Sequence, residues 1–133
     1  QLQNYKNPFL ENRAWHYKNK LDEAFLNEQA QQFVGTYDFK AFCSSGSSVE
    51  DTVRTVKSFS VERNGDEVLF FVEADGFLYN MVRIMVGSLI EISENKIEKD
   101  KLLDIIKSGD RNLAGRTAPP QGLYLNKVNY GED

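Results

Sequence analysis

The most apolar stretch of the chain, GFLYNMVRIMVGSLIEI at residues 76–92, constrains the fold more than any other feature. Eleven of its seventeen residues are large apolar or aromatic ones, so most of its surface has to be buried. A membrane-spanning helix needs about 20 residues, so this stretch is too short, and it carries Arg83 near its centre. A guanidinium keeps its charge when it is buried, so Arg83 needs a partner or water beside it. The partner of Arg83 is therefore the first question that this chain raises.

The length of this apolar pattern predicts a helix over residues 77–92. On such a helix, Tyr79, Asn80, Arg83 and Gly87 form one narrow polar stripe, while the rest of the surface is apolar and favours burial. A glycine in the stripe would let another backbone or a ligand approach closely. Arg83 then either points into a cleft and meets a carboxylate there, or reaches the helix edge and pairs with a surface acid. The spacing leaves both alternatives open.

The composition sets broad limits on the function. A chain of 133 residues predicts one domain, and its net charge of −4 gives no global support for a nucleic-acid-binding protein, although a local basic patch stays possible. The single cysteine, Cys43, excludes an internal disulfide and a multi-cysteine zinc site. No signal peptide is visible, so a cytoplasmic protein is the simplest interpretation. The chain begins with Gln rather than Met, which indicates a processed protein or a fragment.

Two further segments have helical patterns. Residues 21–35 repeat apolar side chains at helical spacing, with Asp22 as the expected N-cap and Gly35 as the expected end. Residues 97–110 predict another helix that ends at Gly109. The residues expected to face inward from this second helix are Leu102, Ile105 and Ile106.

The clearest local signal is a β-hairpin over residues 55–75. Two β-prone runs flank Asn-Gly-Asp at 64–66, which favours a type I′ turn, and the continuous run Val68–Val72 indicates a strand covered on both faces. The composition of residues 43–52 predicts a loop, and the pattern of residues 123–130 predicts a final strand. The expected order is α-β-β-α-α-β, an α+β fold with an antiparallel sheet and helices packed on one face.

Few side chains outside residues 76–92 suggest chemistry. The only histidine, His16, lies between two aromatics and is typical of packing, and the run SSGSS at 44–48 reads better as a flexible linker than as a phosphate cradle. Arg54 and Lys57 either contact a polyanion or are simply solvated, and Arg116 lies in a constrained loop that could hold a functional side chain. No carboxylate pair, Ser/His/Asp set or Cys/His pair stands out, and no spacing supports a metal site.

Three blocks give a specific resemblance. The stretches DFKAFCSSGSSVEDTVRTV (38–56), GFLYNMVRIMVGSLIEI (76–92) and AGRTAPPQGLYL (114–125), in this order and spacing, resemble the C-terminal half of the tRNA pseudouridine synthase A family. The resemblance implies a pseudouridine synthase fold of two similar α+β halves with a cleft between them. It also implies isomerisation of uridine to pseudouridine in the anticodon stem-loop of tRNA, without a cofactor and usually as a homodimer.

The resemblance also assigns site residues. The family's catalytic aspartate lies in its N-terminal half, within the pattern A-G-R-T-D. Residues 114–117 repeat the first four letters, but Ala118 stands in the place of the aspartate and two prolines follow, as in the family's C-terminal loop. Arg83 is therefore implied to pair with an aspartate that this chain does not contain. The base-pocket residues so implied are Phe77, Asn80, Gly122 and Leu123, and the residues implied to contact RNA phosphates are Arg54, Lys57 and Arg116.

The resemblance sets the domain prediction. Residues 1–20 are expected to be a connector from a missing N-terminal half, and residues 21–133 the C-terminal domain of a tRNA pseudouridine synthase that is inactive on its own. Two alternatives stay open. One is a stand-alone α+β RNA-binding module, which would need solvent-facing aromatics on the strand at 67–73. The other is a purely structural dimerisation domain.

Overall fold

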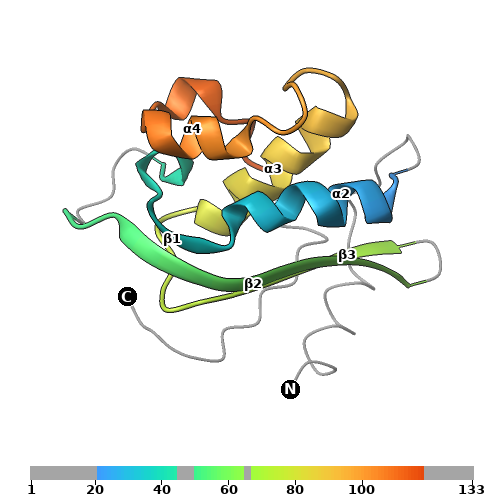
Figure 1. Cartoon of the computed structure of the whole chain (residues 1–133), viewed down its shortest axis with the longest axis horizontal. Coiled ribbons are helices and arrows are strands. Elements are labelled where there is room, and N and C mark those ends of the chain that lie inside the picture. Colours follow the sequence, from blue (N-terminus) through green and yellow to red (C-terminus); the bar gives the residue numbers. More distant parts are fainter. Residues whose placement is uncertain (1–20, 45–49, 65–66, 119–133) are drawn as a thin grey trace.

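The computed structural model describes residues 21–44, 50–64 and 67–118. Its strands form one antiparallel sheet in the order β1-β2-β3, and its helices cover one face of that sheet (Figure 1). The α+β architecture expected from the sequence is confirmed. The strands are β1 (Gly35–Asp38), β2 (Val53–Asn64) and β3 (Glu67–Ala74), the α-helices are α2 (Glu23–Ala30), α3 (Met81–Ser93) and α4 (Leu102–Ser108), and the 3-10 helices are η1 (Gln31–Phe33), η2 (Lys40–Phe42) and η3 (Arg111–Leu113).

The predicted hairpin is present as β2 and β3. Their register runs from Val56 opposite Ala74 to Asn64 opposite Glu67, with one irregularity that leaves Lys57 as an extra residue on β2. Alternation along β3 sends Phe70 and Val72 into the helix-covered core. Leu69, which points to the opposite face, is buried as well, whereas Phe71 is half-buried. The predicted type I′ turn includes residues 65–66, which lie outside the described part of the chain.

The first helix begins where the sequence predicts and ends earlier. The Asp22 carboxylate accepts a hydrogen bond from the Phe25 N–H at 3.1 Å, which confirms the N-cap. After Ala30 the chain continues as η1 and then enters β1, a strand that the sequence analysis missed because four residues are too few for a pattern. Gly35 opens this strand at φ 138° rather than ending a helix. A Cβ there would lie 2.8 Å from the Tyr37 ring, so a side chain has no room.

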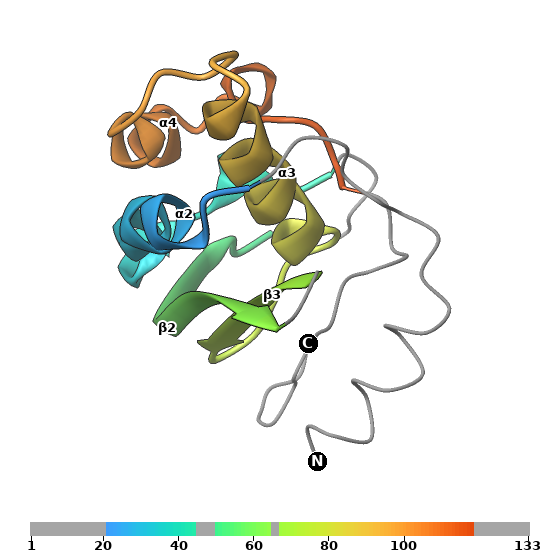
Figure 2. The same ribbon diagram turned by 90° about the vertical axis from the view of Figure 1, so that its right-hand side faces the viewer.

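The central helix is shorter than predicted. Helix α3 starts at Met81 and not at residue 77, because Asn80 adopts the left-handed conformation (φ 61°, ψ 16°) and the Met81 N–H donates to Leu78 O in a turn before the helix. Asparagine tolerates this conformation better than most residues. Tyr79 and Asn80 therefore precede the helix instead of lying on its stripe. In Figure 2, α3 stands over the sheet beside α2, with α4 farther out.

The remaining helix completes the layer above the sheet. Leu102, Ile105 and Ile106 of α4 are buried as predicted, and Gly109 ends the helix at φ 65°. The helix begins at Leu102 rather than residue 97, and the predicted strand at 123–130 lies outside the described residues. None of the described helices is long and apolar enough to cross a membrane.

Candidate functional site

Arg83 lies in the first turn of α3, partly buried, and its guanidinium contacts two neutral groups. Its Nε donates to the Ala118 carbonyl at 2.7 Å, and its Nη1 donates to the Asn80 Oδ1 at 3.1 Å. Among the residues that the structure describes, no carboxylate forms an ion pair with it. The sequence left a cleft carboxylate and a surface acid open as partners, and the described residues supply neither.

The loop that carries Ala118 is fixed to the same helix. The Ala118 N–H donates to the Arg83 carbonyl at 2.9 Å, so this one residue is bonded to both the backbone and the side chain of Arg83. The loop crosses α3 at Gly87, where a Cβ would lie 1.8 Å from the Arg116 carbonyl oxygen. The prediction that Gly87 admits another backbone is confirmed. The position of the Ala118 carbonyl, and with it that of Nε, is set by this crossing.

Two side chains that the sequence analysis missed hold the loop in place. The Ser88 hydroxyl is fully buried, accepts from the Gly115 N–H at 2.8 Å and donates to the Ile84 carbonyl at 2.7 Å. Arg111 Nη1 donates to the Gly115 carbonyl at 2.8 Å from the other side. Gly115 has no room for a side chain, since a Cβ would lie 2.6 Å from Ser88 Cα. A lone serine in the middle of an apolar helix was the available sequence signal.

The guanidinium has donors left over. Of its five N–H groups, two are donated to Ala118 and Asn80, which leaves one on Nη1 and both on Nη2 without a partner among the described residues. Because Nε is occupied, a carboxylate cannot approach side-on through Nε and Nη2. The open approach is end-on, through Nη1 and Nη2, which is a two-point geometry that arginine offers and lysine does not.

The other residues predicted for the base pocket lie in different environments. Asn80 is directly bonded to Arg83, as stated above, and its Nδ2 donates to the Ser44 hydroxyl at 3.0 Å. Phe77 is half-buried against the core, three residues before Asn80. Gly122 and Leu123 lie outside the described residues. The structure thus brings Asn80 and Arg83 together and leaves all four base-pocket assignments, that of Asn80 included, as predictions.

The residues predicted to contact RNA are spread over two elements. Arg54 on β2 donates from Nη1 to the carbonyls of Asp51 and Val53, each at 2.8 Å, and Lys57 is exposed at the irregular position of the same strand. Arg116 lies instead on the loop over α3. Phosphate contacts by all three stay predictions. Phe70, which the alternative RNA-binding module would need at the surface, is only 4% exposed.

Arg116 is engaged in an ion-pair network at the C-terminal end of α3. Its guanidinium contacts the carboxylates of Glu94 at 3.0 Å and Glu91 at 3.3 Å. The hydrogen bond to Glu94 is the largest cause that raises the pKa of Arg116 above its ordinary value, and Glu91 adds to it. A raised pKa of a cation stabilises the fold at pH values below its ordinary pKa for as long as its acidic partners carry their charge, so this contribution is present at neutral pH. The pair is 39% exposed on the arginine side, which limits it to about 0–1 kcal/mol.

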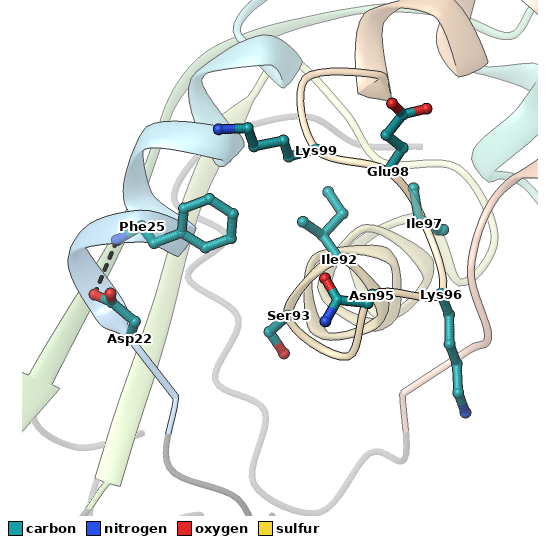
Figure 3. A pocket seen from close by; sticks show the side chains of 9 residues that line it. All are labelled: Asp22, Phe25, Ile92, Ser93, Asn95, Lys96, Ile97, Glu98 and Lys99. Carbon is teal, nitrogen blue, oxygen red and sulfur yellow. Dashed lines mark hydrogen bonds between the residues drawn. The ribbon is translucent and has the colours of Figure 1, made fainter.

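A cavity of about 750 Å³ also lies near the C-terminal end of α3, between the start of α2 and the loop after α3 (Figure 3). Two acids and two lysines line it, so it has no net charge preference, and Asp22 is already used as the N-cap of α2. It begins at Ile92, roughly 14 Å along the helix from Arg83. The lining residues are Asp22, Phe25, Ile92, Ser93, Asn95, Lys96, Ile97, Glu98 and Lys99. Within the described ranges no cluster of His, Cys, Asp and Glu could hold a metal ion. Arg83 and its loop are therefore the stronger candidate site.

Comparisons with known proteins agree on one family. A family model described as tRNA pseudouridine synthase matches residues 29–131. The chain is similar to a tRNA pseudouridine synthase A of Thermoanaerobacter sp., with 47% identity over 126 residues that make up 95% of this chain and 52% of the relative. It is 48% identical to the protein of the same name from Acetivibrio thermocellus, over 95% of this chain and 52% of the relative. A tRNA pseudouridine synthase A of Neorickettsia sennetsu is 41% identical over 97% of this chain and 53% of its own length. The chain thus spans about half the length of the curated relatives it matches.

Proposed function

The chain belongs to the tRNA pseudouridine synthase family, and from this premise we propose that it forms the C-terminal half of an enzyme that isomerises uridine to pseudouridine in the anticodon stem-loop of tRNA. The match of nearly the whole chain to about half of each relative supports the assignment to one half. The other half would supply the catalytic aspartate. The 133 residues alone would then be inactive, and the whole enzyme would act without a cofactor, as a cytoplasmic homodimer.

The chemistry explains why a guanidinium belongs in this site. The aspartate has to be ionised to attack the uridine, either at C6 of the base or at C1′ of the ribose. The bond between N1 and C1′ then breaks, the uracil turns, and C5 is joined to C1′. The bond between the aspartate and the uridine breaks again, which restores the carboxylate, and the proton on C5 is lost while N1 gains one. An arginine beside the aspartate favours its charged form and fixes its direction.

The single observation that carries the proposal is that Arg83 pairs with no carboxylate among the described residues. Its Nε and Nη1 are held at 2.7 Å and 3.1 Å by neutral groups, and its remaining N–H groups meet no carboxylate in the described part of the chain. A partly buried charge without an opposite charge is costly, so a site built this way favours a carboxylate partner from elsewhere. The proposed partner is the aspartate of the other half, bound end-on.

The remaining predicted residues take roles around this pair. Phe77 and the Gly122–Leu123 segment are proposed to line the base pocket, and Arg54 and Lys57 to contact RNA phosphates. Arg116 is proposed to take part in phosphate binding only where RNA competes with Glu91 and Glu94 for its guanidinium.

The test is to rebuild the two-half enzyme. The chain is joined to the N-terminal half of the Thermoanaerobacter relative, and pseudouridine is measured in unmodified tRNA. We expect activity from the joined protein and none from the 133 residues alone. Arg83→Lys in the joined protein keeps the charge but loses the two-point geometry, and we expect at least about a 100-fold fall in kcat.

The matched control is Arg63→Lys, which alters a β2 arginine paired with Glu23 at 2.9 Å and away from the site. This variant should keep its kcat. Pseudouridine formed by the isolated chain, or normal turnover of Arg83→Lys, would contradict the proposed role of Arg83.

A further inference from the structure

Asn80 occupies the N-cap position of α3 but does not cap the helix with its side chain. Asparagine is common at this position because its side-chain oxygen accepts from the first free backbone N–H groups of the helix. Here that oxygen accepts from Arg83 Nη1 instead, and the amide nitrogen donates to the Ser44 hydroxyl. The side chain is therefore used for a contact that gives up the usual helix cap.

The direction of the Asn80 amide is fixed by its neighbours. Arginine has only donors, so the atom facing Arg83 has to be the oxygen, and the nitrogen then faces the Ser44 hydroxyl, which accepts. The left-handed backbone at Asn80 turns the side chain toward both partners, and the Ile84 N–H holds the Asn80 carbonyl at 3.0 Å. Only one orientation of the amide satisfies both bonds.

Ser44 is itself anchored to the fold. Its N–H donates to the Tyr79 carbonyl at 3.1 Å, which ties residue 44 to the turn before α3. The preceding 3-10 helix η2 and the residue before it place Phe39, Ala41 and Phe42 in the core, each 0% exposed. The hydroxyl of Ser44 therefore extends from a residue that is hydrogen-bonded to the turn before α3 and follows a buried segment.

We propose that Ser44 and Asn80 are positioning residues that fix the direction of the Arg83 guanidinium through the hydrogen-bonded series Ser44 Oγ, Asn80 Nδ2 and Oδ1, and Arg83 Nη1. The proposal rests on the proposed function, in which Arg83 pairs with the catalytic aspartate. Ala118 holds Nε, and Asn80 holds Nη1, so the two together stop rotation of the guanidinium plane. Both polar atoms of Asn80 take part in this series, so the positioning role is distinct from the base contact that the sequence predicts for Asn80.

The decisive comparison is between Asn80→Gly and Asn80→Asp in the joined enzyme. Glycine keeps the left-handed backbone and removes the side chain, so Arg83 loses one of its two contacts. Aspartate also tolerates this backbone and keeps the oxygen near Nη1, but it adds a carboxylate that competes with the catalytic aspartate for Arg83. We expect kcat to fall about 10-fold in Asn80→Gly and further in Asn80→Asp, with KM changed less than about 3-fold in both.

The pH profile and the stability separate positioning from simple structural support. In Asn80→Gly the catalytic aspartate faces a poorly oriented cation, so the acid limb of kcat should move to higher pH by about half a unit. Thermal stability should follow the opposite order to activity, with Asn80→Asp at least as stable as Asn80→Gly. A purely structural role predicts that activity follows stability and that the acid limb stays in place, and that result would overturn the proposal.

Three controls complete the experiment. Asn95→Gly changes another asparagine with positive φ (64°) at the far end of α3 and should leave kcat unchanged. Ser44→Ala should lower kcat less than Asn80→Gly, and the double variant should be no worse than Asn80→Gly, since both act through one contact. If the unaltered joined enzyme is inactive, or Arg83→Lys is fully active, the proposed function fails. If Arg83→Lys loses activity while Asn80→Gly keeps both the kcat and the pH profile, only the positioning role fails.

Discussion

At the scale of single residues, the Ser88 hydroxyl connects the central helix to the loop that holds Arg83. It accepts from the Gly115 N–H and donates to Ile84, and it is fully buried. Replacing serine by alanine in an exposed helix usually stabilises it slightly. Here Ser88→Ala would leave the Gly115 N–H without an acceptor in the core, and we expect a loss of about 1–3 kcal/mol in the free energy of unfolding.

Urea unfolding of the chain, followed by circular dichroism, measures this loss. Ser93→Ala is the matched control, because Ser93 donates only to the Ile90 carbonyl of its own helix and is half-buried. Its free energy of unfolding should change by less than about 0.5 kcal/mol. Equal stability of both variants would show that the loop does not depend on the Ser88 hydroxyl.

At the scale of elements, long periodic patterns and local caps were the features that could be predicted from the sequence. The hairpin of β2 and β3, the N-cap at Asp22 and the inward face of α4 are of this kind, and all three are confirmed. The start of α3 was wrong by four residues, because the apolar pattern runs through the turn before the helix and nothing in it reveals the left-handed conformation of Asn80. The strand β1 was too short to give a pattern.

The central residue of the candidate site, Arg83, could be predicted from the sequence, but its contacts could not. The charge of Arg83 within an apolar stretch singled it out, and Gly87 indicated a close approach that the structure confirms. The partners of Arg83 are a backbone carbonyl 35 positions away and an asparagine outside the helix. A backbone carbonyl has no sequence signal, because every residue has one. Such contacts depend on how the loop packs and not on which residue it carries.

The crossing of the loop over α3 predicts that replacing Gly87 by alanine lowers the stability of the fold, although the same change usually stabilises a helix. Alanine in the middle of a helix is normally more favourable than glycine by up to about 1 kcal/mol. At Gly87 the added Cβ would lie 1.8 Å from the Arg116 carbonyl oxygen, so the loop has to move away. We expect Gly87→Ala to destabilise the chain by about 1–3 kcal/mol and to detach Ala118 from Arg83.

Urea unfolding checks the stability of Gly87→Ala, and amide hydrogen exchange at Ala118 checks the loop, because this N–H donates to the Arg83 carbonyl in the unaltered chain. Exchange at Ala118 should become faster, while exchange within the β2–β3 hairpin should change only as much as the global stability does. A Gly87→Ala variant more stable than the unaltered chain would mean that the close crossing does not exist.

At the scale of the whole molecule, the charge balance does not favour RNA. The chain carries 20 acidic and 16 basic residues, a net charge of −4. In the proposed enzyme, long-range attraction to tRNA would therefore come from a local group of basic side chains or from the other half. Arg54 and Lys57 lie three positions apart on β2, while Arg116 is paired with two glutamates. We therefore expect phosphate contacts from Arg54 and Lys57 rather than from Arg116.

Salt dependence tests this assignment in the joined enzyme. Each phosphate contact that is lost flattens the slope of log K against log salt concentration by about 0.7–0.9, so Arg54→Ala with Lys57→Ala should flatten it by about 1.5. Lys96→Ala with Lys99→Ala removes the same charge beside the cavity at the far end of α3 and is the matched control. If tRNA binds across the β2 side, only the first double variant changes the slope, while its kcat at saturating tRNA stays close to that of the unaltered enzyme, because Arg83 is untouched. Equal changes in both double variants would indicate a general charge effect, and an unchanged slope in the first would place the phosphate contacts on other residues.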